Sequence, residues 1–254
     1  MRFASLGSGS EGNALLVQGG STVVMLDCGF SLQETELRLS RLGVAPDDLS
    51  AVVVTHEHGD HCAGVSRLAR KYGLPVWLTH GTLRARASHL SGLRHSEISP
   101  GCGFSIGDLT LMPFPVPHDG AEPVQFVFQH GVRRLGVLTD TGHITPHIEA
   151  MLSGCDALVL EFNHDEEMLA QGPYPPALKR RVGGHYGHLS NRQAARLLAG
   201  LDVPRLQHLV AAHLSSRNNA VERVWELLRL TPGLADERIA VADQVGGLAW
   251  RDVI

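Results

Sequence analysis

An apolar, β-branched run that leads directly into four potential metal ligands is the feature that most limits how this chain can fold. Residues 51–54 read Ala-Val-Val-Val, and Thr55-His56-Glu57-His58-Gly59-Asp60-His61 follows at once. Such a run is typical of a buried strand, and burying the polar groups that follow it is costly unless something binds them. Imidazole nitrogen and carboxylate oxygen are ligands that Zn²⁺ and similar divalent ions accept. We therefore expect the strand to end at a metal site, with Gly59 letting the chain turn between the ligand pairs.

Other short apolar runs alternate with helical patterns along the chain, which favours an α/β protein whose helices cover packed sheets. Expected strands are Ala14–Val17, Thr22–Leu26, Ala51–Val54, Val76–Leu78, Leu109–Phe114, Val124–Phe128, Leu135–Leu138, Ala157–Leu160 and His208–Ala211. Expected helices follow Ser31, span Cys62–Tyr72, follow Ser190, and follow Asn219, which would act as a cap. No linker or repeat interrupts the 254 residues, so we expect one domain over 1–254.

Composition narrows the function classes. A formal net charge of −4 argues against a generally cationic nucleic-acid binder. No apolar stretch approaches the roughly 20 residues that span a bilayer, so we expect no membrane association. The first ten residues lack a signal pattern, and the four cysteines form no CxxC pair, which together predict a cytoplasmic protein. The fifteen histidines are clustered unevenly, which again points to a metal.

The string His56-x-His58-x-Asp60-His61 resembles the signature of the metallo-β-lactamase superfamily. This resemblance implies an α/β fold, the four-layer αβ/βα sandwich. Later segments fit the same superfamily in the expected order: Pro117-His118-Asp119, Leu138-Thr139-Asp140-Thr141-Gly142 and Ala211-Ala212-His213-Leu214-Ser215. An earlier segment, Leu26-Asp27-Cys28-Gly29, resembles the first acidic motif, in which Asp27 would support a ligand.

The resemblance implies a binuclear metal centre. One divalent ion, Zn or Mn, would be held by His56, His58 and His118. A second ion would be held by Asp60, His61 and His213, and the Asp140 carboxylate would be shared between the two.

Within the superfamily, the chain resembles the YycJ/WalJ subgroup, single-domain proteins described as 5′-to-3′ exodeoxyribonucleases. The segments that carry this resemblance are Ser8-Gly9-Ser10-Glu11-Gly12-Asn13, Glu161-Phe162-Asn163-His164-Asp165, Gly172-Pro173-Tyr174-Pro175, Leu178-Lys179-Arg180-Arg181 and Gly187-His188-Leu189-Ser190-Asn191. The stretch 181–187 and Arg217 depart from the subgroup's pattern.

Two divalent ions about 3.5–4 Å apart can share a water molecule and turn it into hydroxide near neutral pH. This nucleophile suits both phosphodiesters and carboxyl esters, so the groups that handle the leaving group must distinguish the two reactions. Similar superfamily phosphodiesterases use a histidine to protonate the leaving oxygen and a carboxylate to orient it. The resemblance assigns these roles to His188 and Glu161. Asp60, an expected metal ligand, is the third expected catalytic residue. A positioned acid contributes roughly 10²–10⁴-fold.

Six further residues are candidates for substrate binding, and each also has a plainer interpretation. Ser10 and Asn13 lie in a small polar loop that can cradle phosphate or simply form a turn. His164 can line the pocket or be an ordinary loop histidine. Lys179, Arg180 and Arg181 form the densest basic run, suited to phosphate contact but equally typical of a solvated surface.

Our first interpretation of the function is therefore a metal-dependent phosphodiesterase that acts as a 5′-3′ exonuclease. We expect its substrate to be a nucleic acid, namely DNA. The spacing between Asp140 and His213 leaves little room for the inserted domain of the β-CASP nucleases. A small-molecule ester or thioester hydrolase of the glyoxalase II or lactonase type, with His188 idle, is one alternative. A cyclic-nucleotide-type phosphodiesterase is another, and a non-catalytic binding module is disfavoured by the complete ligand set.

Overall fold

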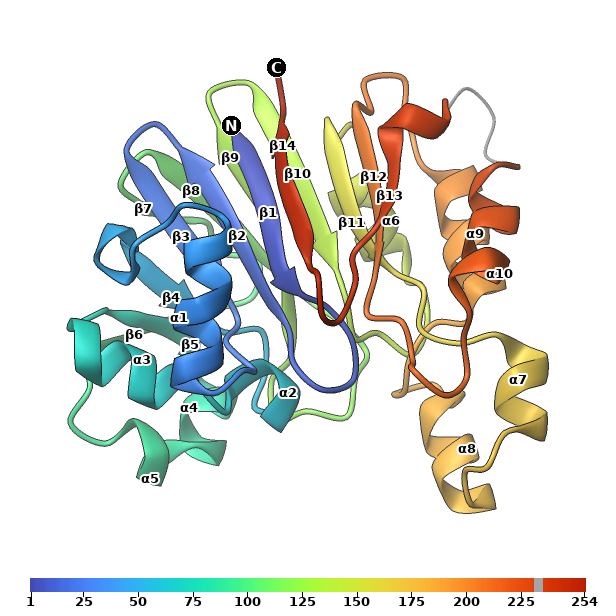
Figure 1. Ribbon diagram of the computed structural model, residues 1–254, viewed down its shortest axis with the longest axis horizontal. Helices are drawn as coiled ribbons and strands as arrows, with labels where there is room; N and C mark the ends of the chain where they lie inside the picture. The colour runs from blue at the N-terminus through green and yellow to red at the C-terminus, as the bar shows by residue number, and fades with distance from the viewer. Residues whose placement is uncertain (231–234) are drawn as a thin grey trace.

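Two seven-stranded sheets form the centre of the molecule in a computed structural model that describes residues 1–230 and 235–254 (Figure 1). The first sheet contains, in spatial order, β14 (Leu248–Asp252), β1 (Arg2–Gly7), β2 (Ala14–Gly19), β3 (Thr22–Leu26), β4 (Ala51–Val53), β5 (Val76–Thr79) and β6 (His95–Ile98). The second contains β13 (Ile239–Val241), β12 (His208–Ala212), β11 (Ala157–Glu161), β10 (Arg133–Leu138), β9 (Val124–His130), β8 (Leu109–Pro115) and β7 (Phe104–Ile106).

Alternating side chains of the central strands divide the core into three apolar layers. In β3, Leu26 packs between the two sheets, whereas Met25 faces the helices outside the first sheet. In β11, Val159 packs between the sheets and Leu158 faces outwards. Because both faces of these strands are buried, the strands read as continuous apolar runs in the sequence.

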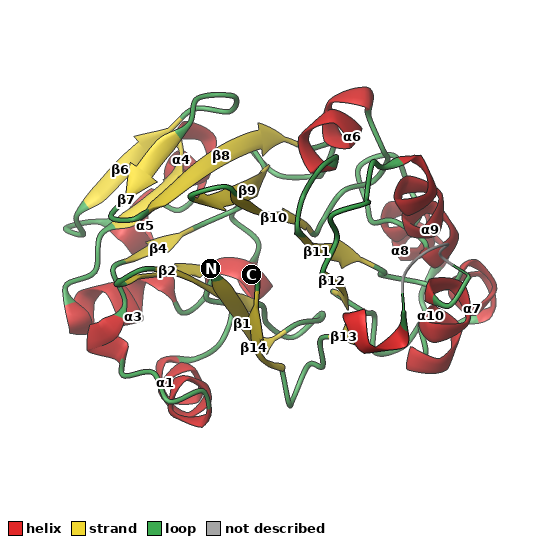
Figure 2. Cartoon of the chain, turned by 90° about the horizontal axis from the view of Figure 1, so that it is seen from above, coloured by secondary structure: helices red, strands yellow, loops and turns green. Residues whose placement is uncertain are grey.

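Helices cover the outer face of each sheet (Figure 2). Those associated with the first half of the chain are α1 (Leu32–Arg41), α2 (Gly59–Cys62), α3 (Val65–Tyr72), α4 (His80–Ala85) and α5 (Ala87–Leu90). Those of the second half are α6 (Pro146–Leu152), α7 (Glu166–Gln171), α8 (Pro176–Val182), α9 (Asn191–Gly200) and α10 (Val221–Leu228). Short 3₁₀ turns span Pro46–Asp48 and Asp236–Arg238. The α1 and α3 side chains pack on the first sheet, and those of α6, α9 and α10 on the second, which confirms the expected four-layer αβ/βα sandwich.

The expected strands are all present, with ends shifted by at most two residues. Two expected helix starts are confirmed as well. The Ser31 hydroxyl accepts a hydrogen bond from the Glu34 N–H at 3.2 Å, and Ser190 does the same for Gln193 at 3.2 Å. Sequence reasoning missed the edge strands β6, β7, β13 and β14, and also β1, which lies next to β14. No helix among the described residues has both the length and the apolar character that crossing a bilayer requires.

The helix expected over Cys62–Tyr72 is present as α3 and ends at the same residue, but it begins only at Val65, because the chain is interrupted around Gly64 after α2. Carbonyls that would continue the helix are used elsewhere: the Asp60 oxygen accepts from the Asn13 N–H at 2.8 Å, and the His61 oxygen from the Cys28 N–H at 2.7 Å. The Gly64 N–H donates to the Cys28 oxygen at 2.8 Å. The segment that carries the expected metal ligands is therefore docked onto the loops that flank β2 and β3.

Asn219 is not the cap of α10, whose N-cap is Ala220 without a side-chain hydrogen bond. The Asn219 amide instead donates to the Phe162 carbonyl at 2.7 Å and the Asn163 carbonyl at 3.1 Å. It ties the chain before α10 to the end of β11.

Candidate metal centre

The candidate site lies where the carboxyl ends of strands from both sheets meet, at the edge that also carries α2, α7 and α8 (lower edge of Figure 1). Asp27 follows β3, Asp140 lies two residues beyond β10, and His213 follows β12. These three have φ of 61°, 57° and 57°, and no other described residue except glycine has a positive φ. This left-handed conformation is strained for residues other than glycine. The backbone therefore turns sharply at each strand end and directs the side chain towards the site.

The seven residues expected to hold metal come together in two groups. The ligand atoms of His56, His58 and His118 lie within 4.8 Å of one another. The same holds for Asp60, His61 and His213, the group expected to form the second set.

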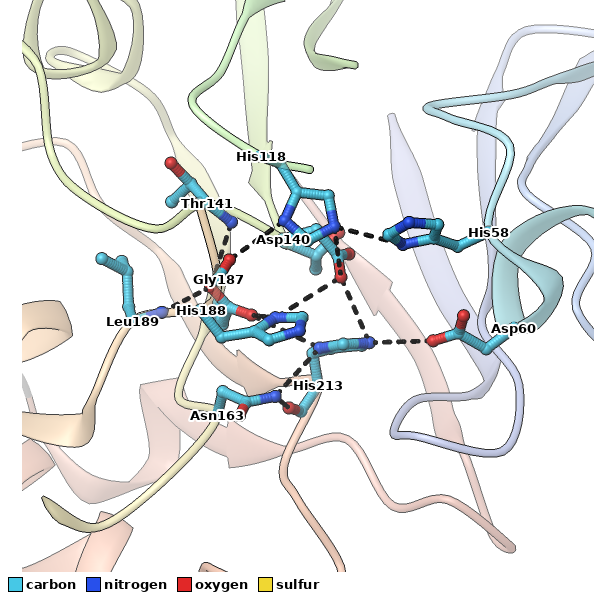
Figure 3. A network of polar contacts seen from close by, with 12 residues as sticks. His58, Asp60, His118, Asp140, Thr141, Asn163, Gly187, His188, Leu189 and His213 are labelled. Carbon is cyan, nitrogen blue, oxygen red and sulfur yellow. Dashed lines mark hydrogen bonds and ion pairs between the residues drawn. The ribbon is translucent and has the colours of Figure 1, made fainter. Parts of the chain in front are cut away.

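Asp140 lies between the two groups. Its Oδ2 is 3.1 Å from His61 Nε2, and its Oδ1 is 3.5 Å from His213 Nε2. On the other side, Oδ1 is 3.9 Å from His118 Nε2. This placement fits a carboxylate that both groups share (Figure 3).

The far nitrogen of each ring has its own partner, and this fixes which nitrogen faces the centre. His61 Nδ1 donates to the Asp27 carboxylate at 2.8 Å, which is the supporting role expected for Asp27. His118 Nδ1 donates to the Gly187 carbonyl at 3.0 Å. His58 is reversed: its Nε2 donates to the Asp119 carbonyl at 3.2 Å, while its Nδ1 lies 3.3 Å from His118 Nε2.

The donor set fits divalent cations. His56 Nε2 is buried and has no hydrogen-bond partner among the described residues, although such groups are normally paired. Burial and the neighbouring His61 hold the pKa of His56 well below its usual value, so the ring stays in the neutral form that binds metal. Burial would raise the pKa of Asp140, but His213 and His61 hold it well below its usual range. A neutral imidazole and an ionised carboxylate therefore face the same point.

Glu161 and His188 form a pair directly beside this cluster. The fully buried Glu161 accepts a hydrogen bond from His188 Nδ1 at 2.7 Å through Oε1, which also lies 3.4 Å from His213 Nδ1. Its Oε2 accepts from the Thr141 and Leu189 N–H groups at 3.2 and 3.0 Å. Burial alone would raise the pKa of Glu161, but mainly the charge of His188 lowers it to about 2. The carboxylate is thus ionised and fixes both rings.

A cleft of about 470 Å³ opens onto these groups. Its lining includes Ser10, His58, Gly59, Asp60, Asp140 and His188. The segment that contains α8 contributes Tyr174, Leu178, Arg181 and Val182. The cleft is large enough for a small ligand or one unit of a polymer.

Of the residues expected to contact substrate, Ser10 and Arg181 line this cleft. Arg181 Nε donates to the Asp119 carboxylate at 2.6 Å across it. Arg180 is exposed to solvent.

Asn13 and Lys179 form hydrogen bonds within the protein, and His164 is buried. The buried Asn13 side chain accepts hydrogen bonds through Oδ1 from the Ser8 hydroxyl and the Gly9 N–H, at 3.2 and 2.9 Å. Lys179 Nζ donates to the Ala170 carbonyl at 2.6 Å. His164 is 3% exposed and is absent from the cleft lining.

Sequence reasoning missed two residues at the site. Asn163 Nδ2 donates to the His213 carbonyl at 3.0 Å and steadies the left-handed turn there. The Asp119 carboxylate lies 3.4 Å from His118 Nε2 as well as against Arg181. Asp119 directly follows His118, an expected ligand, and that position was the signal available for finding it.

Comparison with known proteins agrees with this geometry. The profile of the family described as "Beta-lactamase superfamily domain" matches residues 22–214. Exodeoxyribonuclease YycJ of Bacillus anthracis is 38% identical over 226 residues, covering 87% of this chain and 85% of that protein. Exodeoxyribonuclease WalJ of Streptococcus pneumoniae is 31% identical over 226 residues, covering 87% and 84%.

Solved structures show the same fold at lower sequence identity. Zinc-bound PqqB from Methylobacterium extorquens superposes with a TM-score of 0.73 at 17% identity, covering 99% of this chain and 100% of that chain. The metallo-β-lactamase fold protein YhfI from Bacillus subtilis gives 0.72 at 17% identity, covering 99% of both chains. The sandwich, the His/Asp clusters and these relatives agree with one another: the chain belongs to the metallo-β-lactamase superfamily, in the group of YycJ and WalJ, and is a metal-dependent hydrolase.

Proposed function

We propose that this protein is a phosphodiesterase with two divalent ions, Zn or Mn, that degrades DNA from the 5′ end as an exonuclease. The observation that carries the proposal is the Glu161–His188 pair, set at 2.7 Å beside the Asp140 and His213 side chains. The names of the relatives, exodeoxyribonucleases of 31–38% identity, support DNA as the substrate.

His188 supplies the proton that the leaving oxygen of a phosphodiester needs. Its Nδ1 is committed to the Glu161 carboxylate, so Nε2 is the nitrogen left to act on a ligand in the cleft. An alkoxide is a poor leaving group, and protonation in the transition state contributes roughly 10²–10⁴-fold. Glu161 fixes the ring and stabilises its protonated form, as the buried carboxylate of a catalytic triad does.

When bound, two divalent ions supply a nucleophilic water at neutral pH and neutralise charge on the phosphate oxygens. His56, His58 and His118 would hold one ion, Asp60, His61 and His213 the other, with Asp140 between them. Asp60 also lines the cleft, where its carboxylate can accept a hydrogen bond from the attacking water and fix its direction. Ser10 and the exposed Arg180 are proposed to contact the DNA backbone.

An end-label assay tests this function. Metal-loaded protein is incubated with single-stranded and duplex DNA labelled at the 5′ or the 3′ end, and separately with bis-nitrophenyl phosphate and a thioester. A His213→Ala variant controls for contaminating nuclease. We expect 5′-labelled DNA to release labelled mononucleotide at once, and 3′-labelled DNA to shorten step by step. Hydrolysis of the thioester alone, or release of the 3′ label first, would refute the proposal.

A further inference from the structure

We propose that the α8 side of the cleft is a nucleobase-binding wall on which Tyr174 stacks against the base of the nucleotide being processed. This inference rests on the proposed function for its substrate class. The wall consists of Tyr174, Leu178 and Val182, and all three line the same 470 Å³ cleft as Asp60, Asp140 and His188.

The local structure presents these side chains together. Leu178 and Val182 are four residues apart in α8, so they lie on one face of the helix. Pro173 and Pro175 flank Tyr174 and limit the backbone at the entry to the helix. All three wall side chains are partly exposed. They differ from Asp60, Asp140 and His188, which line the same cleft with polar or charged groups.

The charges nearby favour a neutral flat group over a phosphate at this wall. Arg181, the cationic residue of the α8 face that lines the cleft, is held by the Asp119 carboxylate at 2.6 Å. The pair is close to neutral as a whole, so the wall attracts no net anion. A base fits both the apolar face and the aromatic ring, since every base has a π-face that stacks on tyrosine.

Stacking also fits an enzyme that removes nucleotides without regard to sequence. Alanine substitutions of stacking aromatics weaken binding by about 5- to 150-fold, with little dependence on which base is bound. The wall would therefore hold any terminal nucleotide while the phosphodiester beside it reaches His188. The same wall would have no role towards a substrate that lacks a base.

A binding comparison tests the wall without requiring hydrolysis. The dissociation constants of thymidine 5′-monophosphate and of 2-deoxyribose 5-phosphate are measured by calorimetry on metal-loaded protein. The variants are Tyr174→Leu, which removes the π-face, and Tyr174→Phe, which keeps it. Tyr186→Leu is the matched control. Tyr186 lies in the same connection between β11 and α9 as Tyr174, but it is 64% exposed and does not line the cleft.

We expect the wild type to bind the nucleotide about 5- to 150-fold more tightly than the base-free sugar phosphate. In Tyr174→Leu the two ligands should bind about equally well, whereas Tyr174→Phe and Tyr186→Leu should keep the preference for the nucleotide. Because the ratio compares two ligands on the same protein, a partly unfolded variant does not change it. A wild type without the preference, or a Tyr174→Leu protein that retains it, overturns the inference. If the preference and its loss are seen but DNA stays intact, the wall is supported while the exonuclease proposal fails.

Discussion

Replacing Glu161 with glutamine removes the charge that holds His188 while the side chain keeps its shape. Metal content must be followed as well, because the same carboxylate oxygen lies 3.4 Å from His213 Nδ1. Glu161 Oε2 accepts two hydrogen bonds from fixed backbone N–H groups, at 3.2 and 3.0 Å. Glutamine has a single acceptor oxygen in its side chain, and this oxygen will accept the hydrogen bonds from the two backbone N–H groups. The amide NH₂ must then face His188 Nδ1, which at 2.7 Å can meet a donor only with its lone pair. The ring is left neutral, with its one proton on Nε2.

The expected loss follows from the part that the protonated ring plays. A general acid contributes roughly 10²–10⁴-fold, which corresponds to about 3–5 kcal/mol of activation free energy. The loss should reach this size only when the leaving group is a poor one. A nitrophenolate leaves without a proton, so its release should fall less than about tenfold.

The assay compares kcat/KM for two substrates. One is a thymidine dinucleotide, whose leaving group is a nucleoside alkoxide, and the other is the nitrophenyl ester of thymidine monophosphate, whose leaving group is nitrophenolate. Glu149→Gln, an exposed change of the same chemistry on α6, is the matched control. Because the pair acts as a unit, Glu161→Gln combined with His188→Ala should be no worse than either single variant. Equal losses on both substrates, or additive losses in the double variant at unchanged metal content, would refute the reasoning.

Three further outcomes follow from the structure. His56→Ala should lower the bound metal measured by mass spectrometry from two ions per chain to one, and an unchanged count would contradict the two-group assignment. Gly64→Ala should lower the free energy of unfolding in urea by roughly 1–3 kcal/mol, because its Cβ would clash with the Phe30 carbonyl oxygen. Gly59→Ala meets nothing within 4 Å and should cost less. Burial tends to raise the pKa of Asp156, but a backbone N–H and nearby arginines lower it, so its stabilising contribution is present above the unfolded value near 3.9 and is lost as pH falls through the folded one. The difference in unfolding free energy between wild type and Asp156→Asn should therefore shrink below about pH 4, and a difference constant from pH 7 to 3 would contradict this.

The central strands and the clustered histidine and aspartate side chains could be predicted because both leave local signals. Buried parallel strands read as short apolar runs, and the clustered polar residues follow directly after them. The edge strand β6 reads His-Ser-Glu-Ile, with a single apolar residue, since it is held mainly by main-chain pairing to β5. No periodicity in the sequence reports that pairing.

The break between α2 and α3 and the contacts of Asn13 had no local signal either. Both depend on hydrogen bonds between segments far apart in the chain, such as that from the Asn13 N–H to the Asp60 carbonyl at 2.8 Å. Lys179 likewise looked like a free cation, although its Nζ donates to the Ala170 carbonyl. A basic run identifies charge, but only tertiary structure shows which charges are already engaged.

The left-handed corners at Asp27, Asp140 and His213 have an evolutionary consequence. Each corner stores about 1–3 kcal/mol that a glycine would release. When a mutation replaces one of these three side chains, the relief of backbone strain offsets much of the stability lost with its contacts. The sandwich therefore stays folded. Inactive descendants of such a scaffold should arise easily and fold well, with glycine or asparagine at the three corners, whereas regaining activity requires a stability reserve elsewhere in the molecule.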